Sequence, residues 1–208
     1  MSKEKITLNI PTSWNDVSIG MYKKFSKLLK EKITEEEKNV KVVCILCNVK
    51  EETLTRFRYK DLKLISKDLA KLLNTEPKDE GDKLIKKVDF NNKKYGFIPN
   101  LSTISLGEYV DIEKLAQDPY GNLNKIMSIL YRPIVKESGT RYSIGDYEPK
   151  EDDWGIFESF PMLAAYSALN FFFCLSKTLP KDLNKSLRVQ ARENWKKNLN
   201  RLRVNTDG

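Results

Sequence analysis

The stretch from residue 95 to residue 134 constrains the fold most, because strand, helix and chain-break signals follow one another closely in it. Just before it and at its start, two short β-prone runs, Val88–Phe90 and Tyr95–Ile98, flank the sequence Asn91-Asn92-Lys93-Lys94. Asparagine tolerates positive φ, so the sequence predicts a β-hairpin here. Pro99 has no N–H to donate to a ladder and is expected to end the second strand.

Two helices are expected after this hairpin. Ser105 and Glu108 have the spacing of a capping box, which predicts a helix from 105 to about 117. The Asp-Pro-Tyr-Gly sequence at 118–121 predicts a turn. Pro133 is expected to end the second helix, because proline clashes with a continuing helix. The apolar positions that indicate this second helix are Leu123, Ile126, Met127 and Leu130.

A looser copy of the same order occurs at the N-terminus. Ile10-Pro11 followed by residues 18–22 parallels Ile98-Pro99 followed by residues 105–109. The apolar runs Lys41–Leu46 and Lys125–Leu130 then follow in the two copies. A degenerate internal duplication and convergence on one strand-to-helix connection both explain the match. Gly20 and Gly107 occupy the third position of each capped segment, which suggests close backbone packing rather than a phosphate-binding loop.

Taken together, these patterns predict a predominantly helical α+β fold with six to eight helices and a small β-hairpin or sheet. The sheet is expected to contain residues 6–10, 88–90 and 95–98. Besides the two helices above, helical segments are expected at 18–32, 34–47, 54–59 (a short turn), 61–73, 156–177 (buried or in a subunit interface) and 182–204 (basic and amphipathic).

The linker-like sequence NTEPKDEG at 74–81 suggests two halves, 1–76 and 77–208, although the chain could also form one compact domain. Residues 137–153 are rich in glycine, proline, tyrosine and charge, and they lack a helical period. We interpret them as an extended arm or an interaction loop.

The chain has 208 residues and a net charge of +8, from 37 basic and 29 acidic residues. A lysine-rich surface can be simply solvated, or it can contact nucleic acid or a membrane. Lys63, Lys67 and Lys71 show the same ambiguity, since their spacing places them on one helix face that could contact phosphate or only water.

The complete absence of histidine removes the usual general base, most metal sites and the Ser-His and Cys-His nucleophile pairs. Of the three cysteines, Cys44 and Cys47 form a CxxC in an apolar helical run and Cys174 lies far away, so buried free thiols are expected. The acidic pairs Glu108/Asp111 and Asp152/Asp153 receive no catalytic role, because exposed acids near helix starts are common. We therefore expect neither enzymatic activity nor a cofactor or metal.

The longest apolar run, residues 162–175, is too short to span a bilayer, so membrane insertion is not expected. Aromatic side chains suggest a protein interface, although the first three could instead pack on the protein's own surface: Tyr142, Tyr147, Trp154, Phe157 and Phe160. The basic C-terminal segment offers candidate nucleic-acid contacts: Lys185, Arg188, Arg192, Trp195, Lys196, Lys197, Arg201 and Arg203.

Three segments resemble a group of small tailed-bacteriophage virion and tail-assembly proteins: Lys94–Pro99, Leu106–Asp111 and Ile129–Ile134. The resemblance implies a non-enzymatic structural protein of the tail or the portal-proximal region, assembled in the host cytoplasm. Its partners would be copies of itself and other virion proteins, with DNA possible nearby. A ring or connector subunit, a tail-assembly chaperone and a packaged protein remain open, as does a basic nucleic-acid-binding accessory protein.

Overall fold

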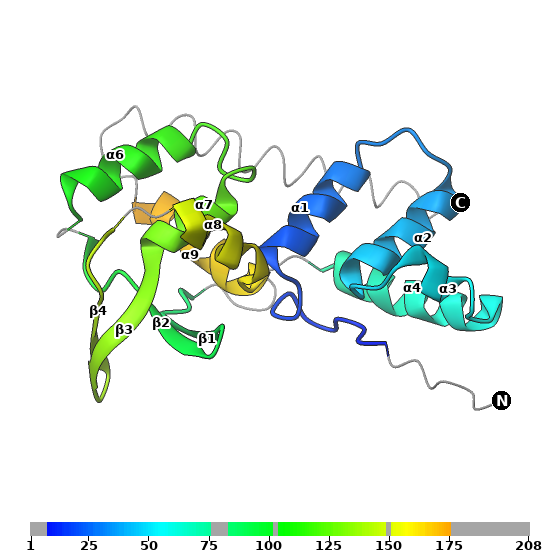
Figure 1. Cartoon of the computed structure of the whole chain (residues 1–208), viewed down its shortest axis with the longest axis horizontal. Coiled ribbons are helices and arrows are strands. Elements are labelled where there is room, and N and C mark those ends of the chain that lie inside the picture. The colour runs from blue at the N-terminus through cyan, green and yellow to red at the C-terminus, as the bar shows by residue number, and fades with distance from the viewer. Residues whose placement is uncertain (1–7, 76–82, 102–103, 149–150, 176–208) are drawn as a thin grey trace.

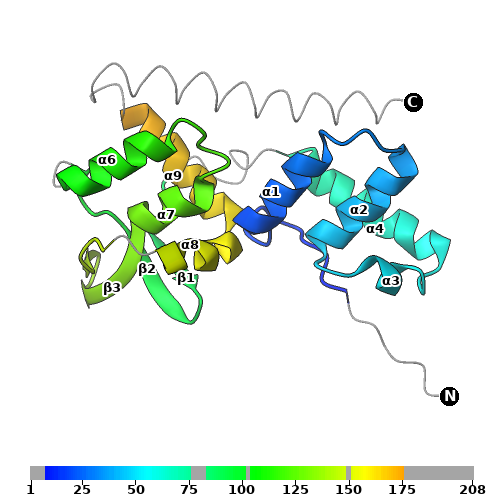
Figure 2. The same ribbon diagram turned by 45° about the horizontal axis from the view of Figure 1, so that its top comes forward.

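The computed structural model describes residues 8–75, 83–101, 104–148 and 151–175. In these ranges it contains eight α-helices and a four-stranded antiparallel sheet, which confirms the predicted α+β fold. The helices α2 to α4 lie at one end of the molecule and the sheet lies at the other, together with α6 to α9 (Figure 1). Figure 2 shows α1 between these two groups.

The N-terminal helices are α1 (Ile19–Leu28), α2 (Glu35–Leu46), α3 (Glu51–Leu54) and α4 (Tyr59–Leu73). Helices α1 and α2 begin next to the predicted starts at 18 and 34, and both are capped: Oγ of Ser18 accepts from the N–H of Met21, and Thr34 forms a capping box with Glu37. Asn48 ends α2 with a φ of 51°. This left-handed residue lets the N–H of the next residue donate to the carbonyl of Cys44 at 3.0 Å.

The sheet has the order β1-β2-β3-β4, with β1 at Lys87–Phe90, β2 at Lys93–Phe97, β3 at Tyr131–Ser138 and β4 at Arg141–Ile144. The β1–β2 hairpin confirms its prediction, since Asn91 and Asn92 have φ values of 51° and 58°. Residues 8–10 form no strand, so the predicted N-terminal strand is wrong over its described part.

The β3–β4 hairpin is the largest departure from the predictions. Helix α7 (Leu123–Leu130) passes directly into β3, and Pro133 lies within that strand opposite Tyr95 instead of ending a helix. Pro133 is tolerated because it stands at the end of the β2–β3 ladder, where its carbonyl accepts from the N–H of Gly145 at 3.0 Å. The predicted loop at 137–153 is therefore wrong over 137–144, which belong to β3, its turn and β4. It is also wrong over 151–153, which are helical.

The C-terminal part of the described chain contains α6 (Leu106–Leu115), α8 (Glu151–Ile156), a 3₁₀ turn η2 (Phe157–Ser159) and α9 (Met162–Leu175). A single helix over 156–177 was expected, but the chain is extended at Phe160. Tertiary hydrogen bonds hold this break: the N–H of Ile19 donates to the carbonyl of Phe160 at 2.9 Å, and the N–H of Met162 donates to that of Val17 at 2.7 Å. The start of α1 is thereby joined to the start of α9.

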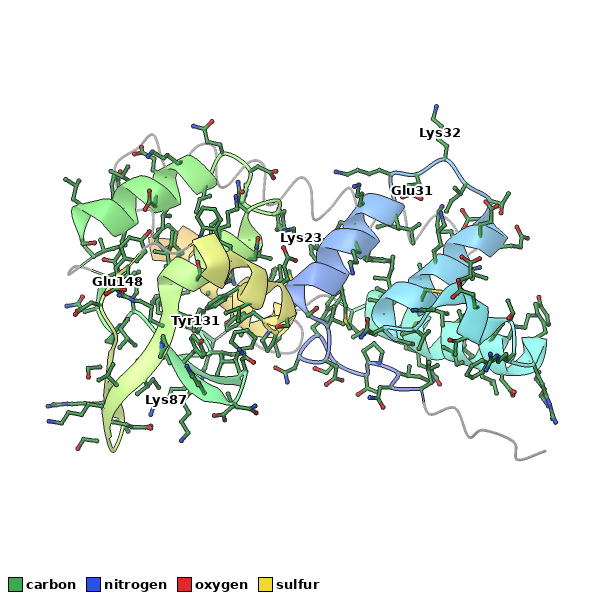
Figure 3. The ribbon with its side chains drawn as sticks, in the orientation of Figure 1. Lys23, Glu31, Lys32, Lys87, Tyr131 and Glu148 are labelled. Carbon is green, nitrogen blue, oxygen red and sulfur yellow. The ribbon has the colours of Figure 1, made fainter. Side chains whose placement is uncertain are left out.

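One hydrophobic cluster runs through the described part of the chain and includes residues from both predicted halves. Tyr131, at 0% exposure, lies in this core (Figure 3), and its hydroxyl donates to the carbonyl of Ile85 at 2.6 Å. Within the described ranges, every helix is too short or too polar to cross a lipid bilayer.

Candidate interaction surfaces

An apolar groove of about 500 Å³ lies between the end of β2, helix α6 and helix α9. Among the described residues that line it, four carry a polar group and none carries a carboxylate or a thiol. Such a lining favours an apolar occupant over a charged one. The residues that line the groove are Leu84, Lys86, Phe97, Ile98, Pro99, Asn100, Leu101, Ile104, Tyr109, Ile112, Tyr142, Phe171 and Phe172.

Local sequence signals build the walls of this groove. The capping box of Ser105 and Glu108 starts α6, so that Tyr109 and Ile112, three residues apart, share the face that lines the groove. The N–H of Ile98 donates to the carbonyl of Leu130 at 2.9 Å, which holds the end of β2 against the end of α7. The groove is therefore formed by well-defined elements, but sequence periodicity could not reveal that they converge.

Tyr142 forms part of the groove wall from β4. Its hydroxyl donates to the carbonyls of Phe97 at 2.7 Å and Lys86 at 3.2 Å. The ring lies against Gly96, where there is no room for a Cβ. In this conformation Tyr142 packs on its own protein, which is the second of the two roles left open for it by the sequence.

Tyr147 also packs on its own protein, in a polar cluster beneath α6. Its hydroxyl donates to Oδ2 of Asp111 at 2.6 Å, and the guanidinium of Arg132 lies 6.0 Å from the centre of its ring. Burial, followed by the bond to Asp111, raises the pKa of Tyr147. Nη2 of Arg132 lies 2.7 Å from Oε1 of Glu108, an ion pair without hydrogen-bond alignment, since that oxygen makes no hydrogen bond among the described residues.

Glu108 and Asp111 both contact other groups of the chain, and the bond from the N–H of Ser105 shows the capping role that the sequence predicts for Glu108. Glu108 is 4% exposed and holds the N–H of Ser105 at 2.7 Å in addition to Arg132. Each carboxylate of this pair thus has a structural role. The side chains of the other acidic pair, Asp152 and Asp153, lie outside the described part of the structure.

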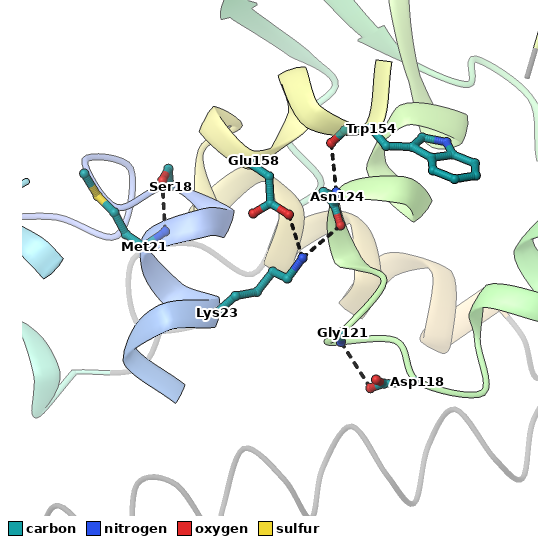
Figure 4. A network of polar contacts seen from close by, with 8 residues as sticks. All are labelled: Ser18, Met21, Lys23, Asp118, Gly121, Asn124, Trp154 and Glu158. Atoms are coloured by element: carbon teal, nitrogen blue, oxygen red, sulfur yellow. Dashed lines mark hydrogen bonds and ion pairs between the residues drawn. The ribbon is translucent and has the colours of Figure 1, made fainter. Parts of the chain in front are cut away.

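Trp154 borders a second polar network, which joins α1 to the sheet-containing half (Figure 4). Nζ of Lys23 donates to Oε1 of Glu158 at 2.6 Å and to Oδ1 of Asn124 at 3.2 Å. Nδ2 of Asn124 then donates to the carbonyl of Trp154 at 2.8 Å. The indole ring of Trp154 lies under Nζ of Lys125, 4.4 Å from the ring centre. Trp154 therefore packs on its own protein, as Tyr142 and Tyr147 do.

Phe157 and Phe160 are candidate interface residues by sequence, in a segment expected either to be buried or to lie in a subunit interface, and the structure places them in the core. Phe157 is 3% exposed and Phe160 is 0% exposed, and their stacked rings are 5.3 Å apart. Both rings contact Phe90 of β1, and the ring of Phe160 also contacts Tyr131 of β3. These two residues are therefore core residues in the structure.

The described thiols are free and sit in an apolar setting. Cys47 is buried, Cys44 is half-buried, and burial raises the pKa of Cys47 to about 11. Within the described residues, no group of three or more cysteine and acidic side chains is arranged to hold a metal ion. The side chain of Cys174 lies outside the described residues.

The outer face of α4 combines lysines with exposed apolar side chains. Tyr59 is 76% exposed and Leu64 is 56% exposed, and Nζ of Lys63 lies 5.6 Å from the centre of the Tyr59 ring. The lysines at 63, 67 and 71 were predicted from the sequence as one helix face, but Tyr59 beside them was not. A tyrosine four residues before a lysine is the signal that could have identified it.

All candidate nucleic-acid contacts of the C-terminal segment, Lys185 to Arg203, lie outside the described residues. Comparison with protein-family models, curated proteins and solved structures found no significant match to this chain.

Proposed function

We propose that this chain is a non-enzymatic structural component of a tailed bacteriophage particle that acts through subunit contacts, in a tail or connector ring or during tail assembly. Its location would be the virion, in the tail or near the portal, after assembly in the host cytoplasm. Its partners would be copies of itself and other virion proteins. The resemblance noted in the sequence supports this class of function.

The apolar groove carries the proposal. Two of the three segments of the resemblance, 94–99 and 106–111, contribute Phe97, Pro99 and Tyr109 to its lining. The third segment, 129–134, includes the start of β3, which pairs with β2 beside them. A mostly apolar groove, with Lys86 as the one charged side chain among its described lining residues, suits apolar side chains from another subunit, and closed oligomers bury surfaces of this kind.

The experiment is the mass of the purified full chain by light scattering after size exclusion, at low and high salt. We expect a discrete oligomer that survives high salt, because apolar contacts are not screened. Ile104→Glu places a charge in the groove at a half-buried position and should dissociate the oligomer.

Leu64→Glu is the matched control, since it introduces the same charge at an exposed leucine far from the groove. Circular dichroism must show that both variants are folded. A wild-type monomer at every concentration would contradict self-assembly, and an oligomer unaffected by Ile104→Glu would exclude the groove. Peptide mass spectrometry of purified particles separately distinguishes a virion component from a chaperone that leaves before maturation.

A further inference from the structure

The lysines of α4 form one continuous outward stripe. Lys60, Lys63, Lys67 and Lys71 are all exposed, and at 100° per residue they fall within an arc of roughly 80°. The buried side of the helix, formed by Ile65, Leu69, Leu72 and Leu73, faces the opposite way. The side chains that anchor α4 are thus separate from those that it presents to solvent.

Acidic residues do not interrupt this stripe. At the same angular spacing, Asp61 and Asp68 both fall on one edge of the outward face, roughly 100° from its centre. Nζ of Lys71 lies 2.7 Å from Oδ1 of Asp68, in an exposed pair that contributes little in water. The centre of the face therefore remains positive.

Exposed apolar side chains distinguish this stripe from an ordinary solvated helix face. Five large hydrophobic side chains are exposed in the described part of the chain, and two of them, Tyr59 and Leu64, belong to this face. Tyr59 is 76% exposed and presents an aromatic surface beside the first lysines. Solvation of a helix requires lysines, but it does not require an exposed aromatic ring.

We propose that this face of α4 binds single-stranded nucleic acid. The lysines hold consecutive phosphates, and the ring of Tyr59 stacks on an unpaired base. From Lys60 to Lys71 the helix rises by about 17 Å, which matches roughly five nucleotides of a strand. An acidic peptide would use the lysines but would gain nothing specific from the aromatic ring.

The site lies at the end of the molecule opposite the sheet (Figure 1). It shares no residue with the groove lining. A chain that contacts other subunits through the groove can therefore leave this face open to nucleic acid. The inference stands independently of the proposed assembly function.

The test is fluorescence anisotropy of a dye-labelled 20-nucleotide oligo(dT) with the full chain, over a series of salt concentrations. The triple variant Lys60→Gln/Lys63→Gln/Lys67→Gln should reduce the slope of log affinity against log salt by about 2, at about 0.7 per lost phosphate contact. Lys24→Gln/Lys27→Gln/Lys30→Gln on and just after α1 removes the same charge from exposed lysines and should leave the slope unchanged.

Tyr59 provides the second arm of the test. Tyr59→Ala should weaken binding to the single strand by about 5-fold or more, and Tyr59→Phe should restore it because the stacking ring returns. Binding to a duplex of the same length should not respond to Tyr59→Ala. The proposal would be overturned if the two triple lysine variants reduced the salt slope equally, or if Tyr59→Ala left the affinity for the single strand unchanged. Equal dependence of polyglutamate binding on the α4 lysines, without any effect of Tyr59, would assign the face to acidic proteins instead.

Discussion

The ring of Tyr142 on β4 covers Gly96 on β2, and its hydroxyl donates to the carbonyl of the next residue, Phe97, at 2.7 Å. A Cβ at Gly96 would come within 3.0 Å of two ring carbons of Tyr142. The strand therefore requires glycine here for space, although the φ of Gly96 is not positive.

Gly96→Ala should lower the free energy of unfolding by about 1–3 kcal/mol, because the tyrosine must move and lose its hydrogen bonds. Urea denaturation measures the change. Gly155→Ala is the matched control: nothing lies within 4 Å of a Cβ there, and alanine favours its helix α8. Equal effects of the two substitutions would show that Tyr142 does not restrict Gly96.

Asn124 is the central residue of the junction between α1 and the sheet-containing half. It is 5% exposed, accepts from Lys23 and donates to the carbonyl of Trp154. Asn124→Ala should cost about 1–3 kcal/mol, since it leaves a buried carbonyl without its donor. Lys41→Ala removes only the exposed pair with Glu31 and should cost less than about 1 kcal/mol in the same urea experiment. A smaller loss for Asn124→Ala than for Lys41→Ala would refute the assigned role.

Arg132 neutralises Glu108 inside the protein, where their side chains are 14% and 5% exposed. Arg132→Ala should destabilise the fold by about 3–5 kcal/mol, because a buried carboxylate loses its counter-charge. The double variant Arg132→Met/Glu108→Leu should lose less than Arg132→Ala, since no charge remains buried. Thermal unfolding of the two variants tests this order, and the reverse order would show that the pair is not effectively desolvated.

The stability of the fold should fall at alkaline pH because of Tyr147 and Tyr131. Burial raises the pKa of both residues above the ordinary value of 10.0, and for Tyr147 the bond to Asp111 adds to the effect. A folded-state pKa above the unfolded one contributes stability that is complete below pH 10 and is lost as the pH rises beyond it. The urea midpoint, measured between pH 8 and pH 11.5, should therefore fall above pH 10. It should fall less steeply for the variant Tyr147→Phe.

Cys47 should react slowly with alkylating reagents in the native protein. Its pKa is raised to about 11, mainly by burial, so little thiolate exists at pH 8. Burial also raises the pKa of Cys44, with a further contribution from Glu51. Pulsed iodoacetamide labelling followed by peptide mass spectrometry should show strong protection of Cys47 that disappears in urea. Rapid native labelling of Cys47 would contradict the burial that the structure assigns to it.

Several sequence predictions were confirmed because their causes are local. The cap at Ser105 needs only Glu108 three residues later, and the turn at Asn91-Asn92 needs only two residues that accept positive φ. The predictions around Pro133 failed because an apolar helix runs directly into an apolar strand, without a polar break. Gly139, with a φ of 59° in the two-residue turn between β3 and β4, was the available signal for this hairpin.

The candidate groove could not be predicted, because its lining comes from segments far apart in the sequence. Phe97, Tyr109 and Phe171 each follow a local period, but only the packed chain brings them to one cavity. The break at Phe160 is a different case, because a local signal for it existed. The apolar neighbours suggested a continuous helix, but Pro161 disfavours a helical conformation of Phe160 before it. The carbonyl of Phe160 then accepts the first N–H of α1, a long-range bond that holds the extended conformation.

The sequence by itself determined the caps, the helix faces, the β1–β2 turn and the lysine stripe of α4, because these depend on residues within a few positions of one another. Only the tertiary structure decided the pairing of β3 with β2, the burial of Phe160, the pairing of Glu108 with Arg132 and the groove. In each of those cases the deciding partner lies many residues away, so its contribution to the free energy exists only in the folded chain.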